Sequence, residues 1–439
     1  MRRNWTAALA AAALMMAAGA GTAQENWPQW RGPDQNNIAP SADPPVTWGE
    51  SENILWKAAL PSWSGSSPIV WGEKVFVMSP SKPEPGAGEQ EKAGGDALLL
   101  LCLSKQDGGT LWEREVAVGN ALFNKQNNTS PTPVTDGTHV WALTGSGVIA
   151  ALDMDGNVVW RKNIPAQYGE FGLNFGYASS PVLYGGNVII QVLHGYRTDA
   201  PSYLLALDGA TGEERWRVER PTDAPKEAPD AYNTPTLLKG KDGDQLILSG
   251  GDCVTGHDPG TGAEKWRAYG LNPRNDEYNR IIATVAAADG MVFAPSRKKP
   301  LIAVRADGAG DVSATHVVWK WEQAGGPDVP TPLCDGRFFY MVDDRGVATC
   351  LEPKTGAVIW GPERTAPGTV SASPLLAGGR LYITNEDAVT TVMAAGPSFK
   401  ILATNKLDGG NTLSSFAVSG DRLFLRTASH LYCIGAPGK

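Results

Sequence analysis

The sequence predicts an all-β fold, and specifically an eight-bladed β-propeller of four-stranded antiparallel blades closed by an N-terminal strand. Three features predict it: a hairpin motif that recurs eight times, a tryptophan that recurs in most of the repeats, and a last repeat that lacks its final strand. We expect a signal peptide at residues 1–23 and an extension at 24–52 that wraps or plugs the ring. A single propeller domain is expected at 53–439.

The recurring hairpin starts with Ser/Thr-Pro or a decayed form of it, continues through an apolar run and a Gly- or Asp-containing turn, and ends in an alternating run. Proline suits the first residue of a strand because no ladder N–H is lost there. The copies follow one another at roughly 40 to 55 residues, a period typical of propeller blades. The eight copies are "SSPIVWGEKVFV", "TSPTPVTDGTHVWAL", "ASSPVLYGGNVIIQV", "NTPTLLKGKDGDQLILS", "ATVAAADGMVFAP", "VPTPLCDGRFFYMV", "SASPLLAGGRLYIT" and "LSSFAVSGDRLFLR".

The second half of each repeat is a third apolar run, a turn and a fourth run that carries tryptophan in six repeats. The eighth repeat ends at "HLYCIG" without a fourth run, and "NILWKAALP" near the N-terminus supplies one, which would close the ring and leave no open sheet edge. Because an indole buries on the order of 150–250 Å², we expect these tryptophans to dock neighbouring blades. A row of stacking sites for a sugar or cofactor is the alternative, and the once-per-blade regularity disfavours it. The docking set is Trp56, Trp112, Trp160, Trp216, Trp266, Trp319 and Trp360.

The N-terminal residues predict export. "MRRNWTAALAAAALMMAAGAGTA" has a basic start, an apolar stretch and a small-residue end, which is typical of a signal peptide cleaved after Ala23. A membrane anchor is the alternative, but the apolar segment is short for one and no second run of spanning length follows. Cleavage would leave 36 basic and 46 acidic residues, a net charge of about −10 that disfavours a nucleic-acid partner. We expect a periplasmic or secreted monomer.

Five cysteines are spread along the chain, three of them in apolar runs at matching points of the repeat: Cys102, Cys350 and Cys433. Equivalent points on different sheets lie too far apart for a disulfide, so we expect buried thiols, with a single bridge as the alternative. The chain has no Cys-x-x-Cys motif and its five histidines are scattered, so no metal ligands and no catalytic residues are predicted.

The segments "ALDGATGEERWR", "GHDPGTGAEKWR" and "CLEPKTGAVIW" resemble the A-x-D-x-x-T-G-x-x-x-W tryptophan-docking motif of the pyrroloquinoline-quinone (PQQ) type propellers. That superfamily includes the quinoprotein alcohol dehydrogenases and non-enzymatic members such as the outer-membrane assembly lipoprotein. The segments "NWPQWRGP" and "HLYCIG" further resemble exported PQQ-like repeat proteins of planctomycete-type bacteria. The resemblance implies the propeller fold and does not decide between enzyme and scaffold.

The chain departs from both functional branches of that superfamily. Quinoprotein alcohol dehydrogenases carry two adjacent cysteines against the cofactor and a calcium ion held by carboxylate and amide oxygens, and no Cys-Cys pair occurs here. The assembly lipoprotein needs a lipidated cysteine, and none lies near the predicted cleavage site. PQQ and calcium are therefore expected only if the protein is a dehydrogenase.

One face of the ring is the candidate binding face. In a four-stranded blade, the connections between blades and the loops between second and third strands fall on the same face, which we call the loop face. Aromatic, amide and charged side chains gathered there are typical of ligand clefts and interaction hot spots. Ordinary loop packing is the alternative for any single one of them. The candidates are Trp63, Phe123, Asn124, Lys125, Asn127, Phe175, Tyr177, His194, Tyr196, Arg197, Arg280, Arg297, Asp343, Arg345, Glu386 and Asp387.

The absence of a catalytic motif favours an exported, non-enzymatic scaffold at the cell envelope, which binds an unknown protein, peptide or polar ligand through the loop face. The alternative is a PQQ-dependent dehydrogenase that oxidises an alcohol or a sugar. A glycan-binding module is a third hypothesis and depends only on exposed Trp and Tyr side chains.

Overall fold

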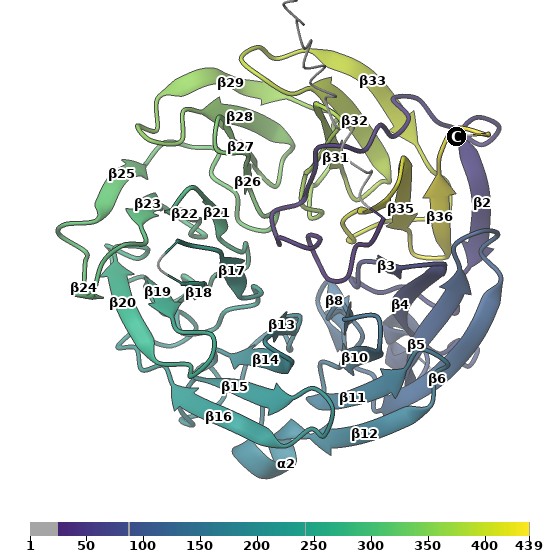
Figure 1. The fold of residues 1–439 in the computed structure, drawn as a ribbon, viewed down its shortest axis with the longest axis horizontal. Coiled ribbons are helices and arrows are strands. Elements are labelled where there is room, and N and C mark those ends of the chain that lie inside the picture. The colour runs from purple at the N-terminus through teal and green to yellow at the C-terminus, as the bar shows by residue number, and fades with distance from the viewer. Residues whose placement is uncertain (1–24, 87, 242, 439) are drawn as a thin grey trace, which may run out of the picture.

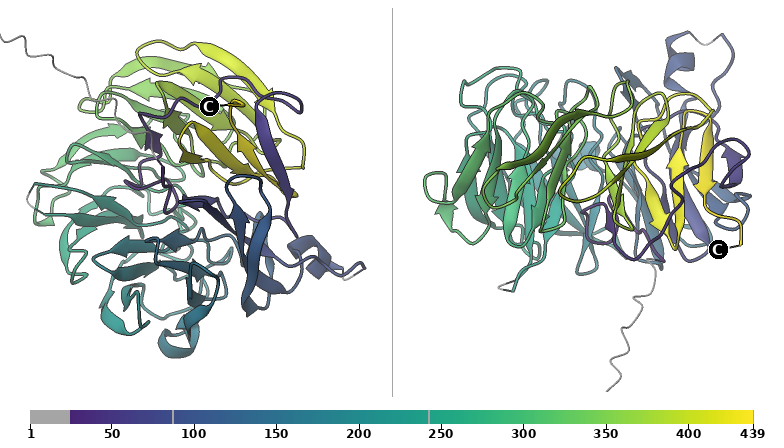
Figure 2. Two further views of the ribbon diagram at one scale, coloured as in Figure 1. Left: turned by 45° about the vertical axis from the view of Figure 1, so that its right-hand side comes forward. Right: turned by 90° about the horizontal axis from the view of Figure 1, so that it is seen from above.

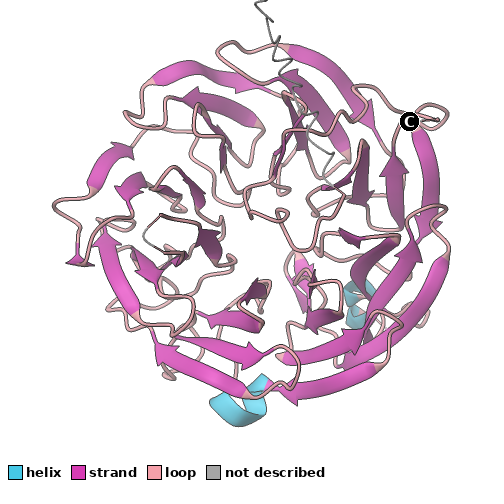
Figure 3. Ribbon diagram, viewed as in Figure 1, coloured by secondary structure: helices cyan, strands magenta, loops and turns pink. Residues whose placement is uncertain are grey.

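Eight sheets, each built on four antiparallel strands, surround a central channel in the computed structural model, and two of them carry a fifth, parallel strand (Figures 1 and 3). The structure describes residues 25–86, 88–241 and 243–438. The predicted signal peptide at 1–23 lies outside the described residues. The prediction of an eight-bladed all-β propeller is confirmed.

Every blade runs from a short inner strand to a longer outer strand. Blades 1 to 4 consist of β3 (Ile69–Trp71), β4 (Lys74–Pro80), β5 (Ala97–Ser104) and β6 (Thr110–Val118); β9 (Val134–Thr135), β10 (His139–Leu143), β11 (Val148–Asp153) and β12 (Val158–Asn163); β13 (Val182–Tyr184), β14 (Asn187–Val192), β15 (Tyr203–Asp208) and β16 (Glu214–Glu219); and β17 (Thr236–Leu238), β18 (Gln245–Gly250), β19 (Cys253–His257) and β20 (Glu264–Tyr269).

Blades 5 to 8 repeat the arrangement, and the eighth takes its outer strand from the N-terminal region. They consist of β21 (Ala286–Ala288), β22 (Met291–Ala294), β23 (Leu301–Arg305) and β25 (Val317–Trp321); β26 (Leu333–Cys334), β27 (Phe339–Val342), β28 (Val347–Leu351) and β29 (Val358–Arg364); β30 (Leu375–Ala377), β31 (Arg380–Thr384), β32 (Val389–Ala394) and β33 (Ile401–Lys406); and β34 (Ala417–Ser419), β35 (Arg422–Arg426), β36 (His430–Ile434) and β2 (Ile54–Ala59).

Strand β2 closes the ring by pairing antiparallel with β36, with Trp56 opposite Cys433. Figure 1 shows this purple strand outside the yellow C-terminal hairpin. The closure predicted from the missing strand is confirmed. All five cysteines are free and buried, as predicted. Cys102 and Cys350 lie opposite Trp112 and Trp360 on the neighbouring strand, as Cys433 lies opposite Trp56. A small side chain at this point leaves room for the indole on the neighbouring strand.

Most of the recurring indoles reach the next blade around the ring. Their N–H groups donate to a backbone carbonyl in the turn between the third and fourth strands of that blade. The pairs are Trp56 to Lys105 (2.9 Å), Trp112 to Met154 (3.1 Å), Trp160 to Gly209 (2.8 Å), Trp319 to Pro353 (2.8 Å) and Trp360 to Gly396 (2.9 Å). Two tryptophans differ: Trp266 donates to Gln245 of its own blade, and the buried indole nitrogen of Trp216 has no partner among the described residues.

These turns require glycine, as Gly212 shows. Its φ is +73°, and a Cβ there would lie 2.7 Å from the Trp160 ring. We expect Gly212→Ala to lower the free energy of unfolding by about 2–5 kcal/mol, because left-handed strain and overpacking add. Gly186→Ala is the matched control, since Gly186 has a φ of +81° and open space at its Cβ, and should cost only about 1–2 kcal/mol. Urea denaturation of both variants measures the difference, and equal losses would contradict the contact.

The N-terminal extension crosses the channel at the level of the inner strands. Trp27 exchanges two backbone hydrogen bonds with Val70 of blade 1 (2.8 and 2.9 Å), and the short strand β1 (Ile38–Ala39) pairs in parallel with β30 of blade 7. Between them, the Gln35 amide exchanges hydrogen bonds with blade 4, accepting from the backbone N–H of Leu237 (2.6 Å). Figure 1 shows the purple segment across the middle of the ring. The channel is therefore blocked by this segment.

The short helices and extra strands lie outside the blades. Helix α1 (Glu89–Ala93), between β4 and β5, rises above the loop face, whereas the extension lies toward the opposite face (Figure 2). Helix α2 (Ile164–Tyr168) follows β12, and β24 (Gly310–Asp311) pairs in parallel with β20. None of the helices in the described part of the chain has the length and apolar character to span a bilayer.

Candidate functional site

A funnel-shaped cavity of about 370 Å³ opens at the centre of the loop face. Its lining comes from all eight blades. It is formed by the connections that lead from the outer strand of one blade to the inner strand of the following blade. Trp30 of the extension also lines the cavity. Below it, at the level of the inner strands, the extension occupies the channel. The funnel is therefore a dead end with the extension as its base.

Eight hydroxyl side chains line the funnel, one from each blade. The backbone N–H of each donates to the hydroxyl oxygen of the next, at 2.9–3.1 Å, and the eighth donates to the first, so the hydrogen bonds form a closed circle. All eight of these residues belong to the Ser/Thr-Pro positions or their decayed forms that mark the repeat. We call the set the hydroxyl crown; it consists of Ser67, Thr132, Ser180, Thr234, Thr284, Thr331, Ser373 and Ser415.

A small hairpin places the aromatic and basic groups of one wall. Strands β7 (Leu122–Phe123) and β8 (Gln126–Asn127) pair, with Asn124 at a φ of +56° in the turn. Phe123 lies so close to Gly176 that a Cβ there would be 2.5 Å from its ring. Lys125, on the same turn, forms an ion pair with Glu386 of blade 7 at 2.8 Å. The hairpin therefore bridges part of the funnel mouth.

Arg280, in the connection between blades 4 and 5, lies between an aromatic ring and an acid. Its guanidinium carbon is 4.9 Å from the centre of the Phe175 ring, and its Nε is 3.6 Å from Glu227 Oε1. The residue after it is fixed because the backbone N–H of Ile281 donates to the carbonyl of Asp230 at 3.2 Å. Arg280 is thus held over Phe175 with its charge compensated by a carboxylate.

Two aspartates of blade 6 also line the funnel. Asp344 accepts hydrogen bonds from the backbone N–H groups of Val329 (2.9 Å) and Asp328 (3.3 Å), and burial raises its pKa. Burial, together with the nearby Asp344 charge, raises the pKa of Asp328 to about 6, although Arg280 and Arg297 act in the opposite direction. One carboxylate oxygen of Asp328, Oδ1, is buried without a partner among the described residues.

Removing the Asp328 charge should stabilise the protein in a pH-dependent manner. A carboxyl whose pKa is higher in the folded than in the unfolded state costs stability once it is ionised, and that cost is absent below about pH 4. We expect Asp328→Asn to raise the free energy of unfolding by about 1–2 kcal/mol at pH 7.5 and to leave it unchanged at pH 4. Thermal unfolding at both pH values measures this. Asp387→Asn, at an exposed carboxylate of the same face, is the control, and a pH-independent gain for Asp328→Asn would contradict the argument.

Five of the predicted candidates line the funnel: Phe123, Asn124, Lys125, Phe175 and Arg280. Two more pair with charges of its lining, Glu386 with Lys125 and Arg297 with Asp328, the latter at 3.9 Å. Five further candidates are at least partly exposed but do not line the funnel. These are Trp63, Tyr196, Arg197, Arg345 and Asp387.

The other four candidates are buried and serve to shape the loops. Asn127 donates to the carbonyls of Trp63 and Ala93, and Tyr177 donates to the carbonyl of Gln191 at 2.8 Å. His194 accepts from the N–H of Gly172 (3.0 Å), and burial lowers its pKa. Asp343 accepts N–H groups within its own turn and pairs with Arg345 at 2.8 Å.

The hydroxyl crown, Trp30 as part of the lining, and Asp328 were missed by sequence reasoning as site residues, whereas Asp344 lies in the predicted loop-face segment "VDDRG", next to the candidate Asp343. The recurring Ser/Thr was the available signal, because a residue type repeated once per blade beside an inner strand must encircle the axis. Asp328 gave no such signal, since its proximity to Asp344 depends on how two loops at blade 6 fold over each other.

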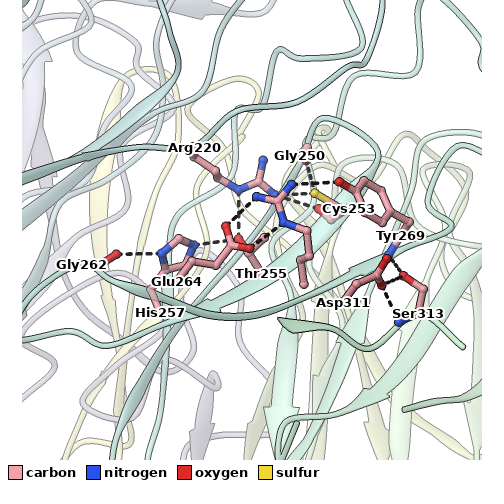
Figure 4. A network of polar contacts seen from close by, with 11 residues as sticks. Arg220, Gly250, Cys253, Thr255, His257, Gly262, Glu264, Tyr269, Asp311 and Ser313 are labelled. Atoms are coloured by element: carbon pink, nitrogen blue, oxygen red, sulfur yellow. Dashed lines mark hydrogen bonds and ion pairs between the residues drawn. The ribbon is translucent and has the colours of Figure 1, made fainter. Parts of the chain in front are cut away.

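A second cluster of titratable side chains lies inside blade 4 (Figure 4). Arg220 donates to Thr255 (2.9 Å) and to the carbonyl of Cys253 (3.0 Å), and His257 contacts Thr255 at 2.9 Å. Burial lowers the pKa of His257 to about 4, so the imidazole is neutral at physiological pH. The four side chains are buried and their partners are protein atoms, so the cluster supports the blade and offers no access to a ligand.

The funnel residues do not fit the quinone and calcium arrangement of the quinoprotein alcohol dehydrogenases. All five cysteines are buried in the blades and no two are adjacent in the sequence. Among residues 25–438, apart from the two that are not described, no group of three or more His, Cys, Asp or Glu side chains is placed to hold a metal ion.

Comparisons with known proteins agree with the fold. The chain matches the family described as outer membrane protein assembly factor BamB over residues 45–170, 96–362 and 309–429. No curated protein matches its sequence significantly. Among solved structures, it is similar to quinohemoprotein alcohol dehydrogenase from Comamonas testosteroni, with 13% identity, a TM-score of 0.62, and coverage of 94% of this chain and 81% of the other.

Two further solved structures are similar over most of their length. BamB from Moraxella catarrhalis has 14% identity and a TM-score of 0.57, with coverage of 87% of this chain and 98% of the other. A europium-containing methanol dehydrogenase has 12% identity and a TM-score of 0.63, with coverage of 92% and 90%. At such identities the likeness shows the fold alone, and it includes both enzymes and an assembly factor.

Proposed function

Because the chain belongs to the PQQ-like repeat family of outer membrane protein assembly factor BamB, we propose that it is a non-enzymatic binding propeller of the cell envelope. Its ligand is a polar or peptide-like segment of a partner, bound in the funnel of the loop face. The observation that carries the proposal is the dead-end cavity itself, to which all eight blades and the N-terminal extension contribute.

The chemistry of the funnel wall supports a polar partner of mixed character. Phe123, Phe175 and Trp30 offer aromatic surface, which is enriched at binding hot spots. The basic groups Lys125 and Arg280 are already paired with carboxylates, so the wall as a whole does not select a strongly anionic surface. A peptide segment combines apolar side chains with amide donors and acceptors and matches this mixture.

A matched set of arginine variants tests the proposal. Arg280→Glu places a negative charge beside Glu227 inside the funnel, whereas Arg345→Glu places one on an exposed side chain that does not line it. The tagged protein is crosslinked in cells, and captured partners are quantified by mass spectrometry. We expect Arg280→Glu and Phe175→Ala to lose the partner that the wild type and Arg345→Glu retain. Retention by all four proteins would overturn the proposal.

The dehydrogenase alternative and the export prediction have their own measurements. The protein is titrated with PQQ and Ca²⁺, and dye-linked oxidation of alcohols and sugars is followed; turnover would overturn the non-enzymatic proposal.

Fractionation and N-terminal sequencing of the mature protein test export, and we expect the chain to begin at Gln24 in the periplasmic or secreted fraction.

A further inference from the structure

The hydroxyl crown offers hydrogen-bond donors that the protein does not use. Each of its eight oxygens accepts one backbone N–H, and none of the eight hydroxyls donates a hydrogen bond to another described residue. A serine or threonine hydroxyl carries one proton that can be donated in addition to accepting. All eight line the funnel, so up to eight O–H donors are available to a ligand in this cavity of about 370 Å³.

A buried positive charge lies directly behind the crown. Arg31 of the extension is 1% exposed, and its guanidinium donates to the carbonyls of Val285 (3.1 Å) and Pro332 (3.3 Å), which follow the crown residues Thr284 and Thr331. No described carboxylate pairs with it, and its buried Nε has no hydrogen-bond partner in the part of the chain that the structure describes. Burial lowers its pKa to about 9, so it stays protonated at neutral pH.

The dead end restricts what can reach the crown. A chain that passes through the ring is excluded because the extension blocks the channel, so only the end of a chain or a small molecule can reach the base. The two ends of a polypeptide have opposite chemistry: the N-terminal ammonium offers donors, and the C-terminal carboxylate offers acceptors. Donor groups and an uncompensated guanidinium favour the carboxylate and disfavour the ammonium.

The funnel wall above the crown suits the residues that precede such a carboxylate. Asp328 lies three positions before the crown residue Thr331, toward the mouth, and Asp344 packs against its backbone. Their carboxylates can accept the N–H groups of an entering chain, while Phe123 and Phe175 cover its side chains. If the base of the funnel binds the peptide carboxylate and the wall binds the peptide N–H groups, the peptide can enter in one direction only, with its C-terminus first.

We propose that the hydroxyl crown, with Arg31 behind it, binds the C-terminal carboxylate of a partner polypeptide. The inference rests on the proposed function and adds the chemical group that the funnel recognises. A scaffold that binds only through the rim of the loop face would not use the free protons of the crown hydroxyls or the uncompensated charge of Arg31.

Peptides that differ only at their ends test the proposal. The probe is an array of random hexapeptides made in three forms: free acid, C-terminal amide, and N-acetylated free acid. We expect binders in the free-acid form, a loss of affinity of about tenfold or more on amidation, and little change on acetylation, since a charge-assisted hydrogen-bond network is lost only with the carboxylate. Equal binding of acids and amides would overturn the inference and leave the proposed function intact.

Variants of the crown separate the hydroxyl from the fold. Thr284→Val removes the O–H and the N–H acceptor at nearly constant shape, and Thr284→Ser restores both. We expect Thr284→Val to weaken the best free-acid peptide by about tenfold and Thr284→Ser to restore it, with no effect of either on the amide. Circular dichroism confirms that each variant is folded. Should inorganic phosphate displace the peptide at equal concentration, the crown would be a general oxyanion site and the assignment to a C-terminus would be wrong.

Discussion

Trp56→Ala is expected to lower the free energy of unfolding by about 3–5 kcal/mol, the range for removing a buried aromatic side chain. Trp56 is 8% exposed, donates to the Lys105 carbonyl of blade 1, and lies 5.9 Å from Phe424 between ring centres. Strand β2 carries it, and β2 joins blade 8 only by non-covalent contacts. The substitution therefore removes one of the contacts that hold the first and last blades together, beside hydrogen bonds such as that from Arg426 to the Met78 carbonyl. Denaturation in urea, followed by tryptophan fluorescence and circular dichroism, gives the loss.

Trp160→Ala is the matched control for ring closure. Its indole makes the same kind of contact, to the Gly209 carbonyl at 2.8 Å, but between blades 2 and 3, which are continuous in sequence. We expect a smaller loss for Trp160→Ala, and self-association on size exclusion only for Trp56→Ala, because an opened ring exposes strand edges. Equal losses with two monomeric variants would mean that closure does not depend on Trp56.

The blade count and the closure could be predicted because every blade repeats the same burial pattern. A Ser/Thr-Pro start, a hairpin and a tryptophan recur, so one blade predicts the others. Trp266 shows where this reasoning stops. Its indole shares a hydrophobic cluster with residues of blade 5, as predicted, but its N–H donates to Gln245 of its own blade. The β23–β25 connection is long and folds back along β20, with Val312 donating to the Arg267 carbonyl, so the usual short turn is absent there.

The candidate site could be predicted only at the level of a face. The topology places Phe123, Phe175 and Arg280 at one end of the ring, and these do line the funnel. Whether a loop side chain turns inward depends on contacts between loops, which no local pattern encodes. Tyr177 is only two residues from Phe175, yet it is 2% exposed and bonded to Gln191, because the chain between them turns into the blade.

The crown shows how one residue serves both the fold and the proposed site. A hydroxyl is short enough to accept the N–H of its neighbour at 2.9–3.1 Å around the whole circle, and that bond leaves its own proton free. Alanine would leave a buried N–H unpaired, at a cost of about 1–3 kcal/mol. The stability of the ring is therefore sufficient reason for Ser or Thr at each position, and a ligand site could arise there without further residues.

The second large effect is expected for Trp27→Ala, which should release the N-terminal extension from the channel. Trp27 is 1% exposed, its backbone pairs with Val70, and its ring packs against Gly32, where a Cβ would lie 2.8 Å away at a φ of +80°. We expect about 3–5 kcal/mol to be lost from the free energy that holds the extension in place. Because the extension can open locally, global unfolding should change less than this.

Limited proteolysis and hydrogen exchange distinguish local release from global unfolding. We expect rapid cleavage and exchange within residues 25–48 of Trp27→Ala, while the blades keep their protection. Trp30→Ala is the control, since Trp30 is half-buried and faces the funnel, and it should leave the extension protected. Release of the extension also removes Arg31 from behind the crown, so Trp27→Ala should abolish the preference for free-acid peptides. An extension that stays protected in Trp27→Ala would show that Asn37 and β1, bonded to blade 7, suffice to hold it.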